Sequence, residues 1–152
     1  MRHVKFIDAN GDRFIDPVGY LDALPTFVDD LPPGARAFAA DPEHYNFHGK
    51  RCVKDLNPDS VQRGETGGEP WLTLGFRHNC WKHDEDLTIH YPGVATPDLP
   101  DWTNFNSLVL DEVLPHAHGC SHEFRFLKGS LTVISRDLIA TWTRADCPDM
   151  PA

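Results

Sequence analysis

The alternation of hydrophobic and polar residues in the second half of the chain predicts β-strands. Leu72, Leu74 and Phe76 occupy every second position between residues 71 and 76, and residues 87–91 repeat the pattern. Successive side chains of a strand point to opposite faces of its sheet, so each of these segments buries one face. Further strands are predicted at 108–114, 122–127, 131–135 and 138–142. Several short strands with close turns favour an antiparallel sheet or a small β-barrel.

The first third of the chain predicts a hairpin followed by one helical segment. Two short apolar runs flank Asn10-Gly11, the pair that best tolerates the left-handed angles of a tight turn, which indicates a hairpin over residues 3–16. Between residues 20 and 31 apolar side chains recur at helical spacing, and Pro25 inside this segment predicts a kink or two short helices. The chain of 152 residues therefore indicates a single α+β domain, mostly β.

Three segments between these elements lack a clear period. Residues 57–70 are polar and rich in Gly, Asp and Glu, so we interpret them as a loop. Residues 91–106 hold several prolines and glycines and indicate a long connection. Residues 35–40 fit a short strand and a turn of helix equally well.

The balance of charged residues and the cysteine count restrict the class of protein. The 14 Lys and Arg against 23 Asp and Glu give a formal net charge of −9, which argues against nucleic-acid binding because that function needs a basic face. No apolar run approaches the roughly 20 residues that span a bilayer, and we find no secretory signal, so we expect a cytoplasmic protein without membrane contact. The four cysteines contain no CxxC pair, and in that compartment we expect reduced thiols rather than disulfides.

Histidine is concentrated in one part of the chain. Six of the nine histidines lie between residues 78 and 122. If the strand that begins at residue 108 continues, His116, His118 and His122 share a parity and point to one face, at the rim of the core. Neutral imidazoles are good ligands for zinc, iron, copper and nickel, so these three residues are candidate ligands of one divalent transition metal.

The segment that starts at His116 resembles the first metal-binding motif of the cupin family. His116-x-His118 supplies the motif's pair of histidines. Glu123 or His122 fills the carboxylate position that follows, and Gly129 stands where the family places its turn glycine. The resemblance implies a site inside a β-barrel that holds zinc, iron, manganese or nickel and acts on a small-molecule substrate, as in oxygenases, isomerases and epimerases. It also implies ligand roles for the three histidines, with Glu123 as a ligand or as the catalytic base.

A second cluster supplies further candidate ligands. His78, Cys80 and His83 lie in a predicted connection between two strands, at spacings that zinc and copper sites use. The acidic run at 84–86 follows directly and is placed to orient imidazoles or to act as general bases. If this connection meets the 116–122 segment at one end of the sheet, both clusters converge on one metal centre. The alternative for both clusters is structural, since histidines in strands and loops are commonly hydrogen-bonded side chains.

Two functions from different classes fit these features. The first is a small metal-dependent enzyme, or metal-binding protein, of cupin-like type, whose histidine-bound ion acts as a Lewis acid or activates oxygen. The second is a non-catalytic acidic protein, similar to bacterial immunity proteins and antitoxins, that neutralises a basic protein partner by charge complementarity. The acidic runs at 84–86 and 98–101 favour the second function, whereas the more specific pattern at 114–129 favours the first.

Overall fold

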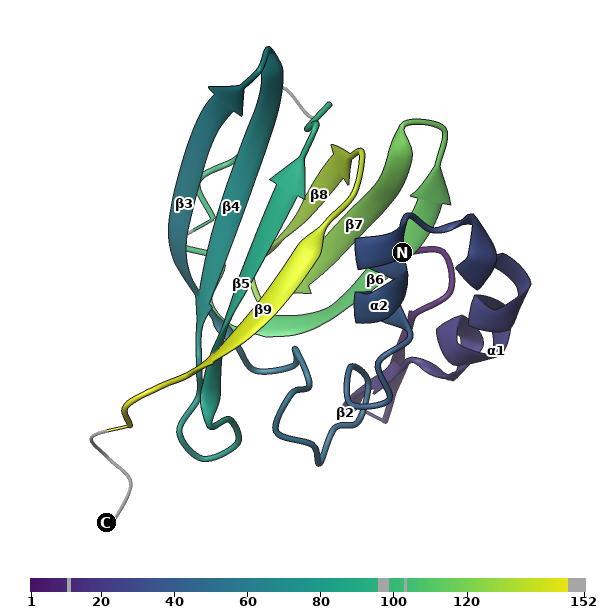
Figure 1. The fold of residues 1–152 in the computed structure, drawn as a ribbon. Coiled ribbons are helices and arrows are strands. Elements are labelled where there is room, and N and C mark those ends of the chain that lie inside the picture. The colour runs from purple at the N-terminus through teal and green to yellow at the C-terminus, as the bar shows by residue number, and fades with distance from the viewer. Residues whose placement is uncertain (11, 96–98, 103, 148–152) are drawn as a thin grey trace.

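The computed structural model describes residues 1–10, 12–95, 99–102 and 104–147. In chain order the elements are β1 (Lys5–Ala9), β2 (Asp12–Asp16), α1 (Val18–Phe27), the 3-10 helix η1 (Val28–Asp30), α2 (Pro33–Ala39), β3 (Asn57–Thr66), β4 (Glu69–Arg77), β5 (Glu85–Pro92), β6 (Leu108–His116), β7 (Gly119–Phe126), β8 (Gly129–Ser135) and β9 (Ile139–Arg144). These strands form the β1–β2 hairpin, a four-stranded sheet in the order β3-β4-β5-β9 and a three-stranded sheet in the order β6-β7-β8 (Figure 1). All pairings are antiparallel, so the predicted α+β class, mostly β with an N-terminal hairpin, is confirmed.

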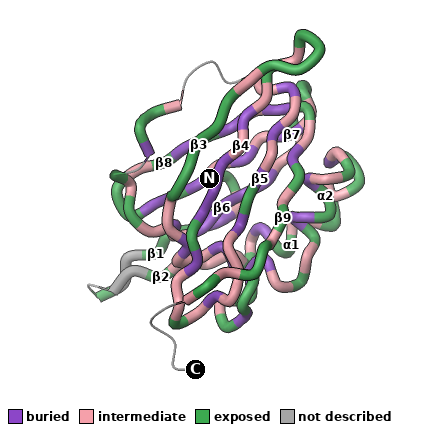
Figure 2. The backbone as a smooth tube through the Cα atoms, turned by 60° about the vertical axis from the view of Figure 1, so that its left-hand side comes forward, coloured by how far each residue is buried: buried purple, intermediate pink, exposed green. Residues whose placement is uncertain are grey.

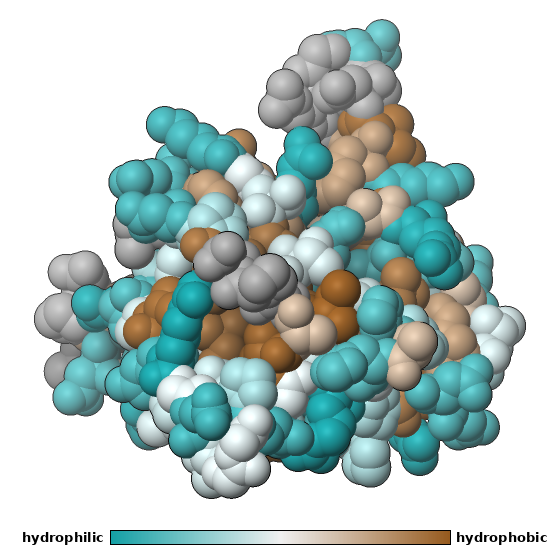
Figure 3. Space-filling model, turned by 90° about the horizontal axis from the view of Figure 1, so that it is seen from above, coloured by the Kyte–Doolittle hydropathy of each residue, from teal (hydrophilic) through white to brown (hydrophobic). Residues whose placement is uncertain are grey.

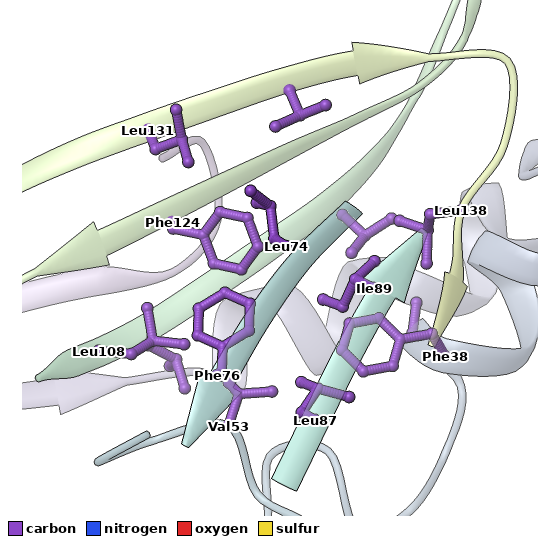
Figure 4. Close-up of a cluster of buried hydrophobic side chains, with 14 of the residues drawn as sticks. Phe38, Val53, Leu74, Phe76, Leu87, Ile89, Leu108, Phe124, Leu131 and Leu138 are labelled. Atoms are coloured by element: carbon purple, nitrogen blue, oxygen red, sulfur yellow. The ribbon is translucent and has the colours of Figure 1, made fainter. Parts of the chain in front are cut away.

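The hydrophobic core lies between the two larger sheets. Leu74 and Phe76 of β4 and Ile89 of β5 are buried and lie in the same cluster as Phe124 of β7 and Leu131 of β8 (Figure 4). The rings of Phe76 and Phe124 come from opposite sheets, with centroids 5.4 Å apart. The period-two pattern in the sequence therefore identified the inward-facing residues of these strands correctly.

Backbone contacts link the larger sheets at their ends, but the described strands do not close into a barrel. Val94, just after β5, forms an isolated bridge with Ser135 at the end of β8. The Leu108 N–H donates to the carbonyl oxygen of Leu56, at the start of β6. The chain itself crosses from one sheet to the other in the short segment between β8 and β9 (Figure 1). Of the two predicted architectures, the protein therefore has antiparallel sheets rather than a barrel.

The predicted helical segment at residues 20–31 forms α1 and η1, and a second α-helix, α2, forms after it. α1 contains Pro25 and is followed directly by η1, as the position of the proline predicted. Residues 35–40, which fitted a strand and a helical turn equally well, fall in α2 and at its C-terminal end. α2 packs against β9. The carboxylate of Asp137 accepts the backbone N–H groups of Gly34 and Ala35, so it caps the start of α2. No helix in the described ranges is long and apolar enough to cross a membrane.

The predicted loop at 57–70 is wrong, because residues 57–66 form strand β3. Its residues pair along the length of β4, with a bulge between Pro58 and Ser60. β3 is an edge strand and most of its residues are exposed, whereas its neighbour β4 is largely buried (Figure 2). A strand with both faces in water has no hydrophobic alternation, so the composition alone suggested a loop.

Large hydrophobic side chains remain at the surface in several places. Seen from above, hydrophobic residues reach the surface near the centre of the view, with hydrophilic residues around them (Figure 3). Elsewhere, Phe6 and Ile7 of β1 are each 43% exposed, and Leu127, just after β7, is 67% exposed. These three residues line one cavity.

Candidate metal centre

The two histidines of the predicted His-x-His motif lie in a hairpin turn. β6 ends at His116 and β7 begins at Gly119, so the strand does not continue through this segment as expected. The His118 backbone N–H donates to Nδ1 of His116 at 3.0 Å, and the His118 Nε2–H donates to the Gly93 carbonyl oxygen at 3.1 Å. Both imidazoles are exposed. The expectation that they face a shared interior is wrong, because the turn interrupts the parity of the strand.

His122 is separated from that turn and fully buried. Its two ring nitrogens contact Asp111 and Tyr91, each at 2.7 Å. Glu123, the predicted catalytic residue, points to the opposite face of β7. Its carboxylate forms an ion pair with the α-ammonium group of Met1 at 2.9 Å. The structure therefore does not bring the cupin-like set together, and no closed barrel encloses it within the described strands.

His122 belongs to a buried charged network that the sequence did not reveal. Asp111 lies between His44 and His122, and its two carboxylate oxygens contact one Nε2 each at 2.7 Å. His44 Nδ1 also contacts the carbonyl oxygen of Phe38 at 2.8 Å. Because a carbonyl and a carboxylate only accept, both nitrogens of His44 carry hydrogen and the ring is an imidazolium. His122 stays neutral, since its Nε2–H donates to Asp111 while the Tyr91 hydroxyl donates to its Nδ1.

The pKa values of these groups agree with that proton arrangement. Burial alone lowers the pKa of His44, but the charge and hydrogen bond of Asp111 raise it above its ordinary value. Burial lowers the pKa of His122, which keeps that ring neutral. Burial opposes ionisation of Asp111, yet the charge of His44 and hydrogen bonds from both rings hold its pKa well below the usual range. The network therefore carries one internal ion pair and no net charge, and its place in the core suits a structural role.

His83, a predicted ligand of the second cluster, uses both ring nitrogens within the protein. Its Nδ1 accepts the Asn79 backbone N–H at 3.0 Å, and its Nε2–H donates to the Cys52 carbonyl oxygen at 2.9 Å. Burial lowers the pKa of His83, so the neutral ring persists. These bonds fix the connection between β4 and β5 against the chain around Cys52, and they leave His83 without a free nitrogen for a metal.

His78 has the arrangement of a metal-binding histidine. Its Nδ1–H donates to the Asp86 carboxylate at 2.7 Å, and its backbone N–H donates to the same oxygen at 2.8 Å. Asp86 thereby sets the tautomer and the orientation of the ring. The other nitrogen, Nε2, lies 3.3 Å from Sγ of Cys80. A carboxylate on one ring nitrogen is the usual support of a histidine that binds zinc through the other.

Cys80 is joined to Cys147 by a disulfide, so the expectation of four reduced thiols is wrong for this pair. β9 runs antiparallel to β5 with Asp86 opposite Thr143, and the Ala145 N–H donates to the Asp84 carbonyl oxygen beyond the strand. This register carries the chain after β9 toward the β4–β5 connection (Figure 1). Cys147, 67 residues after Cys80 in the sequence, therefore meets its partner there.

The two remaining cysteines are free and buried. Burial raises the pKa of the Cys52 thiol above its usual value, and it raises that of Cys120 to about 11. A buried thiol that keeps its proton is a poor nucleophile and a poor metal ligand, so neither residue competes with the pair above.

His78, Cys80 and Cys147 together form a candidate metal centre. Their ligand atoms lie within 4.8 Å of one another, and within the described part of the chain they are the one group of three or more His, Cys, Asp or Glu side chains this close. His78 is buried, while both cysteines are half-buried and in reach of solvent. One imidazole and two thiolates make a soft donor set that suits zinc. The sulfurs become thiolates only when the disulfide opens, and in this structure the disulfide is closed.

The acidic run beside this centre is largely neutralised. Asp84 pairs with Lys50 at 2.6 Å, and Glu85 pairs with Arg51 at 2.7 Å. Asp86 contacts His78, as described above. Within the second acidic run, Asp98 lies outside the described residues. The 84–86 run therefore presents few free carboxylates for a basic partner, and its contacts instead hold the β4–β5 connection in place.

The sequence identified part of this centre. His78 and Cys80 stand out by their spacing, whereas Cys147 lies in a segment without a motif and reaches the site only through the β5–β9 register. Comparisons of the chain with protein-family models, with characterised proteins and with solved structures find no match. The assignment of the site therefore depends on its geometry and chemistry.

Proposed function

We propose that this protein binds a divalent transition metal, with zinc preferred, in a site that opens when the Cys80–Cys147 disulfide is reduced. His78 Nε2 and the two thiolates are the ligands, and Asp86 holds the imidazole in place. The convergence of one imidazole and two sulfurs within 4.8 Å is the observation that carries the proposal. This site replaces the 116–122 cluster as the place where the predicted metal binding occurs.

The distances support zinc coordination after a small rearrangement. Zinc binds sulfur at about 2.3 Å and imidazole nitrogen at about 2.0–2.1 Å, so tetrahedral geometry separates a sulfur from a nitrogen by about 3.6 Å and two sulfurs by about 3.8 Å. The present Nε2–Sγ distance between His78 and Cys80 is 3.3 Å. The Cα atoms of the two cysteines are 5.8 Å apart, so rotation of the side chains is enough to separate the sulfurs.

The exchange between the two states follows thiol chemistry. A dithiol reductant opens the disulfide by thiol–disulfide exchange, gives its two electrons and two protons to the protein sulfurs and leaves as its own disulfide. Zinc then displaces the two thiol protons as it binds. In the reverse direction a small-molecule disulfide takes the two electrons of the bound thiolates and leaves as two thiols, which re-forms the protein disulfide and releases the ion. Disulfide and metal therefore exclude each other.

Three protein ligands leave the fourth position of a tetrahedral zinc ion open. Structural zinc sites are usually closed by four protein ligands, whereas sites with three hold water or a small molecule in the fourth position. The proposed site therefore suits an exchangeable ion, or an ion that binds a small-molecule ligand, better than a zinc ion that permanently stabilises the fold.

Zinc titration of metal-free protein in its reduced and oxidised forms tests the proposal. A chromophoric chelator reports zinc affinity by competition, and cobalt as a substitute reports thiolate ligation through its charge-transfer absorption. We expect the reduced protein to bind one ion with a thiolate signature and the oxidised protein to bind none. Cys80→Ser and Cys147→Ser should remove binding, and His78→Gln should weaken it strongly.

The matched control carries the same His→Gln change at both His116 and His118. These exposed rings belong to the other predicted cluster, so we expect the double variant to bind zinc as the unchanged protein does. Absence of zinc binding by the reduced protein would overturn the proposal, as would equal binding by the oxidised form. Loss of binding in the control variant would return the site to the 116–122 segment.

A further inference from the structure

A cavity separate from the metal centre lies between the β1–β2 hairpin and the neighbouring ends of β6 and β7. Its volume is about 440 Å³, within the range of small-molecule sites. Much of the wall is apolar, and the charged or polar contributions come from the segment around Lys54 and from Arg125. The apolar lining residues are Phe6, Ile7, Ile15, Leu108, Val109, Phe126 and Leu127.

The exposed hydrophobic residues of this region gather at the cavity. Phe6 and Ile7 come from β1, and Leu127 comes from the chain just after β7, so three separate exposed side chains face one space. Leu108 and Phe126 form part of the same wall and are buried in the core. Exposed apolar surface around a concave site favours a ligand that removes it from water.

The charge of the cavity is positive although the chain is acidic. Arg125 lies over the ring of Phe6, with its guanidinium carbon 5.1 Å from the ring centroid, and it forms no ion pair with a side chain that the structure describes. Lys54 and Lys82 both contact the carboxylate of Asp55, at 3.0 Å and 3.4 Å. Of the described residues that line the cavity, Lys54 and Arg125 are cationic and Asp55 is anionic, which leaves one positive charge in a chain of net charge −9.

We propose that this cavity binds a small amphipathic carboxylate, that is, an apolar molecule with one anionic end. The aliphatic and aromatic wall takes the apolar body, and Arg125 takes the carboxylate through its planar pair of N–H donors. A concave space of this volume, with a cation among its lining residues, favours a single small molecule over a membrane surface. The inference does not depend on the metal centre, because none of its ligands lines the cavity.

Three probes with the same ten-carbon chain separate the contribution of charge from that of apolar contact. Calorimetry with decanoate, decanol and decylamine, each below the concentration at which it forms micelles, should rank their affinities in that order. Chemical shifts of backbone amides should change on binding at β1 and around residues 125–127. Equal affinity for the three probes, or shifts confined to other parts of the molecule, would overturn the proposal.

Two variants test the assigned contacts. Arg125→Gln should weaken decanoate binding about tenfold or more, as expected for loss of a charge-assisted contact, and leave decanol binding unchanged. Leu127→Asp should weaken both probes, and because Leu127 is 67% exposed this change should leave the thermal stability intact. Arg63→Gln is the matched control, since Arg63 is exposed and lines a different cavity.

The remaining arms separate a free carboxylate from other anionic partners. Vesicles of phosphatidylcholine with phosphatidylserine should not bind the protein. Binding to these vesicles that Arg125→Gln removes, without binding of free decanoate, would overturn the small-molecule proposal in favour of a lipid surface. The variant Cys80→Ser should bind decanoate as the unchanged protein does, so failure of the zinc experiment and failure of this one remain distinguishable.

Discussion

The proton arrangement of the buried network can be tested with Asp111→Ala. This change removes the acceptor of two buried imidazole N–H donors and leaves the His44 cation without its counter-charge. Breaking a buried ion pair by removing one partner costs about 3–5 kcal/mol, and two unsatisfied donors at about 1–3 kcal/mol each give a similar sum. We therefore expect the free energy of unfolding to fall by about 3–5 kcal/mol.

Asp111→Asn keeps the shape of the side chain and removes only its charge. The amide oxygen still accepts the Nε2–H of His122. The amide NH₂ donates to Nε2 of His44 once that nitrogen has lost its proton, while Nδ1–H of His44 still donates to Phe38. Every polar atom is then satisfied without a charge in the core, so the expected loss is below about 2 kcal/mol.

Urea unfolding at pH 7.5 with the disulfide intact measures the loss of stability in both Asp111 variants. Asp59→Ala on the exposed strand β3 is the control, and its stability should change by no more than about 0.5 kcal/mol. The reasoning is refuted if Asp111→Ala behaves like this control, or if alanine and asparagine destabilise the protein equally, since either result would mean that His44 is not an imidazolium paired with Asp111.

The pH dependence of stability gives a second measurement on the same network. The raised pKa of His44 means that the folded state binds the extra proton above about pH 6.5, so stability falls as the pH rises from there through the folded pKa. The lowered pKa of His122 has the opposite sign, and its contribution falls as the pH drops below about 6.5. Together the two histidines favour a maximum of the free energy of unfolding near pH 6.5. Asp111→Asn should lose the alkaline fall, and curves for the two proteins that run parallel up to pH 9 would contradict this.

Three further outcomes follow from the contacts described above and from one other buried carboxylate. Cys147→Ser opens a loop of 67 residues and should lower the free energy of unfolding by about 4 kcal/mol in the chain-entropy treatment, measured by urea unfolding against the oxidised protein. Glu112 accepts the backbone N–H groups of residues 2, 3 and 4, each at 2.8 Å, so Glu112→Gln should cost about 1–3 kcal/mol and speed hydrogen exchange at these amides. His83→Ala should speed exchange at the Asn79 amide while β5 keeps its protection, because the histidine bonds the connection and the Cys52 carbonyl oxygen but no group of β5.

The strands of the core were predictable because their pattern is a local property. Apart from the buried Gly75, the inward-facing residues of β4 and β5 alternate with more exposed ones, and burial against the opposite sheet enforces the alternation. β3 has no such constraint and carried no signal. The positions of His116 and His118 were not predictable for another reason. The alternation of faces holds only while a strand continues, and β6 ends at His116, with a two-residue turn before β7 begins at Gly119.

The sites depended on contacts between distant segments, which the sequence does not encode by spacing. His44 lies in an irregular stretch, 67 residues from Asp111, and nothing in its neighbourhood indicates a charged ring in the core. His78 could be picked out together with Cys80, but Asp86 and Cys147 join them only when β5 and β9 are aligned. The five histidines predicted as ligands thus take three roles: one candidate ligand, two buried hydrogen-bonding rings and a pair in an exposed turn.

The exposed strand β3 has a consequence for how copies of this protein meet at high concentration. It pairs with β4 on one side, and an edge strand of ten residues is a template on which another chain can add a strand. The bulge at Pro58–Ser60 and the alternating charges of Asp59, Arg63 and Glu65 make this edge irregular and hydrated, which discourages such growth. This strand, which contributes no residue to the buried core, thus has a colloidal role, because its polar residues oppose extension of the four-stranded sheet into a neighbouring molecule at this edge.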